Sequence, residues 1–212
     1  MATKDHQSEP IESASETLQR IFDGHGSVLG SQMADESSRY DVLKKTDFPK
    51  PQRTRRIAVA NQKGGVGKTT STVNTAAALA NKGAQVLVID MDPQGNASTA
   101  LGVSHASGEP SVYDVIEGRS DLGDVITVCP DFPTLDVVPA SIDLSGAELE
   151  VADLPNRNTL LKEALDLYLR QSDKHYDYVF IDCPPSLGLL VINAMCAVTE
   201  MLIPIQACLL YT

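Results

Sequence analysis

Residues 62–70 carry the types and spacing that most clearly indicate chemistry, because three glycines, two lysines and two threonines fall within nine positions. Glycine lets a chain turn tightly enough to aim several backbone N–H groups at one point, with no Cβ in the way. Lys68 is suited to meet the β- and γ-phosphates of a nucleotide, and the Thr69 hydroxyl is suited to bind Mg²⁺. The segment predicts a phosphate-binding loop for ATP, formed by Gly64, Gly65, Val66, Gly67, Lys68, Thr69 and Thr70.

A phosphate loop needs a strand before it and the N-terminus of a helix after it. Residues 56–61 are short, apolar and partly β-branched, as in a buried strand. Residues 71–81 are rich in alanine and place apolar side chains at helical spacing. The alternative, a structural turn with incidental lysines, explains neither flank.

Two further strands are predicted to end in carboxylates. Residues 85–90 are almost wholly apolar and end in Asp90, with Asp92 two positions later. Such a strand indicates a parallel sheet covered by helices on both faces, in which ligands bind at the carboxyl edge. Residues 176–182 form a similar strand that ends in Asp182, which has the form of a Walker B aspartate holding Mg²⁺ opposite Thr69. Taken alone, residues 90–96 also fit a simple strand-ending turn.

Three motifs in this order resemble those of the ParA/MinD ATPases. The loop has Gln62 where the common pattern has glycine and adds Lys63, as in the deviant phosphate loop of that family. Residues 90–96 match its Asp-x-Asp-Pro-Gln-Gly-Asn motif, and residues 183–188 resemble its switch segment. The resemblance implies that Lys63 reaches the nucleotide of a partner subunit, that Asp92 positions the attacking water, and that Asp90 contributes near the Mg²⁺.

The resemblance is to the ParA/Soj type and implies a Mg²⁺-dependent ATPase that forms a homodimer on binding ATP. It also implies non-specific binding to DNA, a centromere-binding partner of the ParB type, and the segregation of chromosome or plasmid copies. The expected location is the cytoplasm, at the nucleoid, without stable membrane association. Two alternatives stay open: a MinD-like ATPase that acts at the membrane, and an inactive fragment that serves only as a binding module.

The charge of the chain is uneven. Residues 1–56 hold nine basic and nine acidic side chains, so the net charge of −11 falls on residues 57–212. DNA phosphates repel such a surface unless a local basic patch or an oligomer overcomes the long-range field.

The cysteines and the apolar runs suit a cytoplasmic protein. Apolar runs are far shorter than the roughly 18 residues of a membrane span, and the N-terminus has no apolar region of a signal peptide. The cysteines form no Cys-x-x-Cys pair, so reduced and mostly buried thiols are favoured over disulfides or a metal site. Cys183 lies beside Asp182, but no base is placed by the sequence to activate it as a nucleophile. The four cysteines are Cys129, Cys183, Cys196 and Cys208.

The expected fold class is α/β: a doubly wound, mostly parallel P-loop sheet with helices on both faces. We predict a disordered N-terminal extension over residues 1–53, with a short helix at 15–22, and an ATPase domain over residues 54–206. Residues 207–212 lack family likeness, which favours a C-terminally incomplete domain with an unpaired apolar edge strand. Further helices are expected at 111–117, 158–169 (capped by Asn158) and 189–198, and further strands at 124–127, 135–139 and 201–205.

Overall fold

The computed structural model describes residues 28–46 and 48–206, and the chain divides into two units, Met1–Phe48 and Pro49–Thr212. In the first unit, helix α2 (Val28–Lys45) lies within the extension that we predicted as disordered. No proline interrupts the chain between Pro10 and Pro49, and Lys44 and Lys45 lie where cations stabilise a helix C-terminus. The helix predicted at 15–22 and the tail at 207–212 lie outside the described residues.

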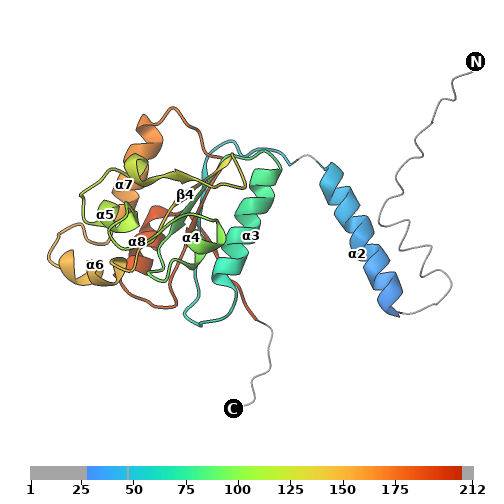
Figure 1. The fold of residues 1–212 in the computed structure, drawn as a ribbon, viewed down its shortest axis with the longest axis horizontal. Coiled ribbons are helices and arrows are strands. Elements are labelled where there is room, and N and C mark those ends of the chain that lie inside the picture. The colour runs from blue at the N-terminus through green and yellow to red at the C-terminus, as the bar shows by residue number, and fades with distance from the viewer. Residues whose placement is uncertain (1–27, 47, 207–212) are drawn as a thin grey trace, which may run out of the picture. The chain divides into compact units, whose positions relative to one another are not determined.

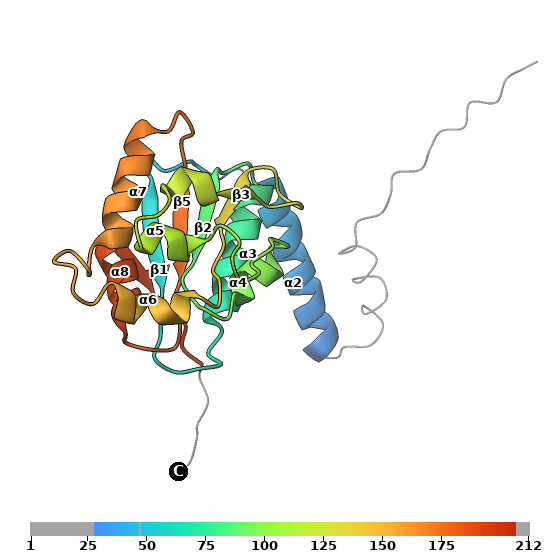
Figure 2. The same ribbon diagram turned by 60° about the vertical axis from the view of Figure 1, so that its left-hand side comes forward.

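The second unit is built on a sheet of order β3-β4-β2-β5-β1-β6. Every neighbouring pair is parallel except β3 with β4, so the predicted doubly wound and mostly parallel sheet is confirmed. Strand β5 lies between β1 and β2, which places it beside β1, 123 positions earlier in the sequence, and beside β2, 92 positions earlier (Figure 2). The strands are β1 (Arg55–Val59), β2 (Val86–Asp90), β3 (Thr127–Val128), β4 (Leu135–Val138), β5 (Tyr178–Asp182) and β6 (Glu200–Leu202).

Helices cover both faces of this sheet (Figure 1). The long helix α3 packs on one face, and α5, α6, α7 and α8 pack on the other. Helix α4 follows β2 directly at the carboxyl edge. The helices of this unit are α3 (Lys68–Asn81), α4 (Asn96–Ala100), α5 (Val112–Ile116), α6 (Leu144–Glu150), α7 (Leu160–Gln171) and α8 (Leu189–Ala197), with a 3₁₀ helix η1 (Leu122–Val125).

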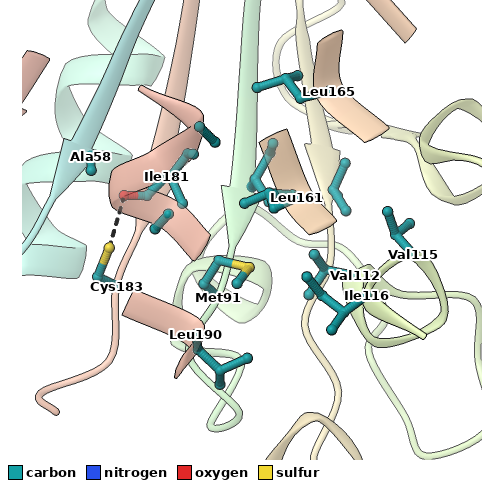
Figure 3. Close-up of a cluster of buried hydrophobic side chains, with 14 of the residues drawn as sticks. Ala58, Met91, Val112, Val115, Ile116, Leu161, Leu165, Ile181, Cys183 and Leu190 are labelled. Atoms are coloured by element: carbon teal, nitrogen blue, oxygen red, sulfur yellow. Dashed lines mark hydrogen bonds between the residues drawn. The ribbon is translucent and has the colours of Figure 1, made fainter. Parts of the chain in front are cut away.

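Successive side chains of each strand point to opposite faces of the sheet, which divides the core into two layers. In β2, Val86 and Val88 join the layer under α3, whereas Leu87 and Ile89 join the opposite layer. Figure 3 shows the second layer, a single buried cluster to which α5, α7 and strand residues such as Ile181 contribute side chains. All five residues of β2 are buried, as expected for a central parallel strand.

Several element boundaries differ from the predictions. Residues 124–127 were predicted as a strand, but Leu122 and Val125 are buried at the three-residue spacing of η1, and β3 begins only at Thr127. The N-cap position of α7 is Thr159 and not Asn158, and its side chain makes no capping hydrogen bond. The final strand stops at Leu202 and lies at the edge of the described sheet. Helices α4 and α6 were not predicted.

Helix α7 allows a direct test of the core. Leu161 is fully buried against the sheet, whereas Leu167 on the same helix is 40% exposed. We expect Leu161→Ala to lower the free energy of unfolding by roughly 2–5 kcal/mol, because it removes packed methyl groups and leaves a cavity. Urea denaturation monitored by circular dichroism measures this loss. Leu167→Ala is the matched control, and an equal loss in both variants would contradict the assigned orientation of α7.

Candidate functional site

The glycine-rich loop joins β1 to α3 at the carboxyl edge of the sheet. Gly65 and Gly67 adopt positive φ angles of 72° and 89°, which side-chain-bearing residues rarely adopt. A Cβ built at Gly64, Gly65 or Gly67 would meet no atom of the described chain within 4 Å, so the space beside the loop is open. Gly67 is the N-cap of α3 and gives no side-chain cap, which leaves backbone N–H groups available to an anion.

Lys68 is buried at the first position of α3, with 7% of its surface exposed. Its Nζ donates to the carbonyl oxygen of Lys63 at 3.3 Å, so the ammonium group lies back over the loop. The Lys63 N–H donates to Asn61 Oδ1 at 2.9 Å, and Asn61 Nδ2 donates to the Pro204 carbonyl at 2.9 Å. These bonds fix the loop backbone, whereas the Lys63 side chain and Thr70 are exposed.

Asp182 joins the loop to the neighbouring strand. It ends β5 in register with Val59 of β1 and Asp90 of β2. Thr69 Oγ1 donates to Asp182 Oδ2 at 2.7 Å, and Thr72 Oγ1 lies 2.9 Å from Asp182 Oδ1. The structure therefore brings Thr69 and Asp182, the two residues that we predicted to hold Mg²⁺, into direct contact.

Burial changes the acid–base behaviour of Asp182. The side chain is fully buried, and this loss of hydration raises its pKa from 3.8 to about 6. The two threonine hydroxyl groups oppose the shift by stabilising the carboxylate, and the nearby charges of Asp90 and Asp92 add to it. A bound cation at this carboxylate would favour the charged form and offset the cost of burial.

Asp90 and Asp92 have different surroundings. Asp90 is fully buried, and its Oδ2 accepts hydrogen bonds from the backbone N–H of Ser98 at 2.8 Å and from its hydroxyl at 2.7 Å. Its Oδ1 accepts from the Asp92 N–H at 3.1 Å, and burial raises its pKa. Asp92 is 8% exposed, and its Oδ1 accepts from the Gln94 N–H at 3.0 Å. Asp90 thus anchors the turn that presents Asp92.

The sequence analysis missed three residues that shape this site: Asn61, Thr72 and Ser98. Thr72 stands three positions after Thr69 on α3, so helical spacing could have placed both hydroxyl groups toward one ligand. Asn61 stands two positions after the end of β1, where a polar side chain meets the carboxyl edge. Ser98 gave no such signal, because its role depends on the turn through Gly95 into α4.

The residues present fit a nucleotide and its metal ion. An open loop of glycines, free N–H groups at α3 and a buried lysine suit a polyphosphate. Within residues 28–46 and 48–206, no group of three His, Cys, Asp or Glu side chains stands ready to hold a metal ion. Thr69 and Asp182 alone suit Mg²⁺ that takes its other ligands from phosphate and water.

Cys183 does not have the properties of a nucleophile. Its thiol is fully buried, and burial beside Asp182 raises its pKa to about 12. Its Sγ is directed at the Ile181 carbonyl oxygen, 3.8 Å away (Figure 3). Cys129, Cys183 and Cys196 are all free thiols, and Cys208 lies outside the described residues.

Comparison with known proteins agrees with this geometry. The model of a family described as AAA domain matches residues 54–211, which extends past the boundary that we predicted at Gln206. The chain belongs to this family. Within it, the chain is of the ParA/Soj type.

Two relatives illustrate the similarity. The sporulation initiation inhibitor protein Soj of Bacillus subtilis is 49% identical over 150 residues, which are 71% of this chain and 57% of that protein. The chromosome partitioning protein ParA of Caulobacter vibrioides is 46% identical over 150 residues, which are 71% of this chain and 55% of that protein. The chain thus spans little more than half the length of these relatives.

Solved structures share the fold. A cobyrinic acid a,c-diamide synthase from Mycobacterium smegmatis, with bound ATP analog and magnesium, has a TM-score of 0.65 and 39% identity over 72% of this chain and 58% of that one. A plasmid partition protein from Borrelia burgdorferi bound to AMPPNP has a TM-score of 0.62 and 28% identity over 72% of this chain and 63% of that one.

None of the helices in the described part of the chain combines the length and the apolar character that a membrane span requires.

Asp182 predicts a pH dependence of stability in the absence of Mg²⁺. Its folded pKa of about 6 exceeds its ordinary value of 3.8, so the folded state binds more protons between these values and the free energy of unfolding falls as pH rises. In the parent, this fall in the free energy of unfolding amounts to about 3 kcal/mol, at roughly 1.4 kcal/mol per pKa unit. Asp182→Asn has no carboxyl group at this position and does not show the fall. The stability of the variant relative to the parent should therefore rise between pH 4 and pH 7.

Urea unfolding in EDTA at several pH values measures this difference. Asp131→Asn, at an exposed position between β3 and β4, controls for the loss of a carboxylate as such. If the free energies of unfolding of Asp182→Asn and the parent differ by the same amount at every pH, the pKa of Asp182 is not raised by folding.

Proposed function

We propose that this chain carries the catalytic site of a Mg²⁺-dependent ATPase that dimerises on ATP and segregates DNA. The observation that carries the proposal is the contact between Thr69 and Asp182 beside an open glycine loop, because it joins a phosphate site to a metal site. The resemblance to ParA and Soj supports chromosome or plasmid copies as the cargo and a ParB-type protein as the partner. Because the chain spans little more than half of those relatives, these activities are proposed for the whole protein.

The residues of the loop would bind and orient the nucleotide. The N–H groups at the start of α3 would point at the phosphates, and Lys68 would leave the Lys63 carbonyl to contact the β- and γ-phosphates. Thr69 and Asp182 would hold Mg²⁺, which supplies charge neutralisation and alignment of the phosphates when bound. Asp92, held by the turn after β2, would orient the attacking water. Asp90 would contribute near the Mg²⁺ through its effect on this turn.

Lys63 is proposed to complete the site of a second subunit. Its backbone is fixed through Asn61 and Lys68, but its side chain is exposed. A cation presented on a rigid loop can reach a phosphate across a dimer interface with little loss of entropy. Hydrolysis would then depend on dimerisation, because phosphoryl transfer relies on charges placed around the γ-phosphate.

Non-specific DNA binding is proposed for the dimer of the whole protein. The net charge of residues 57–212 opposes binding by a single copy of this chain. Co-sedimentation with DNA or with liposomes, each in the presence of ATP, distinguishes the proposed function in DNA partition from that of a MinD-like ATPase acting at the membrane. Location at the nucleoid in the cytoplasm would follow from DNA binding.

A second candidate follows from the structural neighbour named as a diamide synthase. Such an enzyme would use the same phosphate loop to activate a carboxylate, so the loop itself does not separate the two functions. ATP turnover that rises with DNA and a partner protein supports partitioning. Turnover that requires a carboxylic acid and an amine donor supports the synthase.

Lys68→Ala tests the phosphate loop. We expect the affinity for Mg²⁺-ATP to fall by about a hundredfold or more, because loss of one partner of a buried charge pair costs roughly 2–5 kcal/mol. Isothermal titration calorimetry measures the affinity. Lys82→Ala, at the other end of α3, is the control. An unchanged affinity for Lys68→Ala would refute the assignment of the loop.

Lys63→Ala tests the contact between subunits. We expect ATP to bind with its normal affinity, because Lys63 contacts the loop of its own chain only through its backbone. The ATP-dependent increase in mass should be lost, as measured by light scattering. A normal increase would rule out the bridging role while leaving the ATPase assignment intact.

A further inference from the structure

The imidazole ring of His105 lies directly against Gly95, in the turn that follows Asp92. A Cβ built on Gly95 would stand 2.5 Å from His105 Nδ1 and 2.6 Å from Cε1, closer than non-bonded atoms approach. The φ angle of Gly95 is 63°, so the backbone conformation also favours glycine. Gly95 therefore leaves space that the His105 ring fills.

The second contact of His105 is with helix α4. Its Nε2 lies 2.8 Å from the Thr99 hydroxyl oxygen, within hydrogen-bond distance. The Thr99 N–H donates to the Gly95 carbonyl at 2.9 Å, so both contacts of the ring belong to one turn of chain. The preceding residue, Ser98, bonds to Asp90 on the buried side. Helix α4 is thus held from inside by Asp90 and from outside by His105.

The segment that carries His105 is itself held in place. Glu109 Oε2 accepts hydrogen bonds from the Ser104 hydroxyl at 2.6 Å and from the Ala106 N–H at 3.1 Å. Ser107 Oγ lies 3.0 Å from both carboxylate oxygens of Asp143, just before α6. His105 is therefore presented from an anchored loop.

The turn next to the ring is the one that fixes Asp92. The Gly95 N–H donates to the Asp92 carbonyl at 2.9 Å, and the Gln94 N–H donates to Asp92 Oδ1 at 3.0 Å. One end of this turn is anchored by Asp90, and the other end lies beneath His105. Displacement of the ring would free Gly95 and, through these bonds, the carboxylate of Asp92.

We propose that His105 is a positioning residue that holds the Asp92 turn in place for ATP hydrolysis by covering Gly95 and binding Thr99. The proposal rests on the proposed function, because it assigns a consequence for turnover to the position of Asp92. His105 itself touches neither the loop of residues 62–70 nor Asp182 in the contacts described above, so it acts through the turn.

The test compares His105→Ala and His105→Gln in the full chain by two measurements. Hydrogen–deuterium exchange of residues 91–100 should rise by about tenfold or more in His105→Ala, while residues 62–70 exchange at the parent rate. Steady-state ATP turnover should show kcat reduced on the order of tenfold with KM nearly unchanged, because a displaced catalytic group affects the reaction more than binding. His105→Gln, which keeps a group able to bind Thr99, should recover part of both effects.

A second variant checks the contact from the other side. Gly95→Ala should reproduce the effects of His105→Ala, because its methyl group would displace the ring. Gly118→Ala is the matched control: its φ angle of 73° carries similar backbone strain, but a Cβ there meets no described atom within 4 Å. The effects of Gly95→Ala and His105→Ala should be less than additive when combined, because both disrupt one contact.

If residues 91–100 of His105→Ala exchange hydrogen for deuterium at the parent rate, the proposal is overturned. Faster exchange of these residues with an unchanged kcat would overturn it as well. A fall in kcat that His105→Gln does not relieve would also count against it. If the parent chain hydrolyses no ATP, the proposed function fails for this chain, and the exchange data alone decide whether His105 holds the turn.

Discussion

The site depends on one buried carboxylate, that of Asp182, at the end of the central strand β5. Burial of a charge in a packed sheet is unfavourable unless hydrogen bonds or a cation compensate. Here the compensation comes from Thr69 and Thr72, which both stand on the first turns of α3. The glycine loop must therefore end, and α3 begin, where these two hydroxyl groups meet the strand. The position of the phosphate loop follows from the partners that Asp182 requires.

The order of the strands explains how distant motifs reach that carboxylate. Because β5 lies between β1 and β2, Asp182 is level with Val59 before the loop and with Asp90 before the turn. In a parallel sheet the carboxyl ends of all strands meet at one edge, so each loop that leaves this edge faces the same ligand. The cost is a concentration of negative charge, with three aspartates near one another. Burial is the main cause of the raised pKa values of Asp90 and Asp182, and the neighbouring carboxylates add to it.

The sequence was sufficient for most of the fold and for placing the glycine loop and the terminal aspartates at one edge of the sheet, because glycine spacing, apolar strands and terminal aspartates are local signals. It did not predict α2, a polar stretch without a clear apolar stripe that was taken as disordered. It also missed Ser98 and His105. Their contacts with Asp90 and Gly95 form only when the chain turns back after β2, and nothing in their spacing reports that turn. The roles of Lys63, Asp90 and Asp92 remain predictions that the geometry supports.

Asn61 has a consequence for the sheet edge. Its side chain bonds through Oδ1 to the start of the glycine loop and through Nδ2 to the Pro204 carbonyl, just beyond the edge strand β6. Two regions that share one side chain cannot be rearranged independently. If the capture of a phosphate at the loop shifts the chain after β6 through Asn61, then anything that shifts the chain there alters phosphate affinity by the same factor, because coupling between two sites is reciprocal.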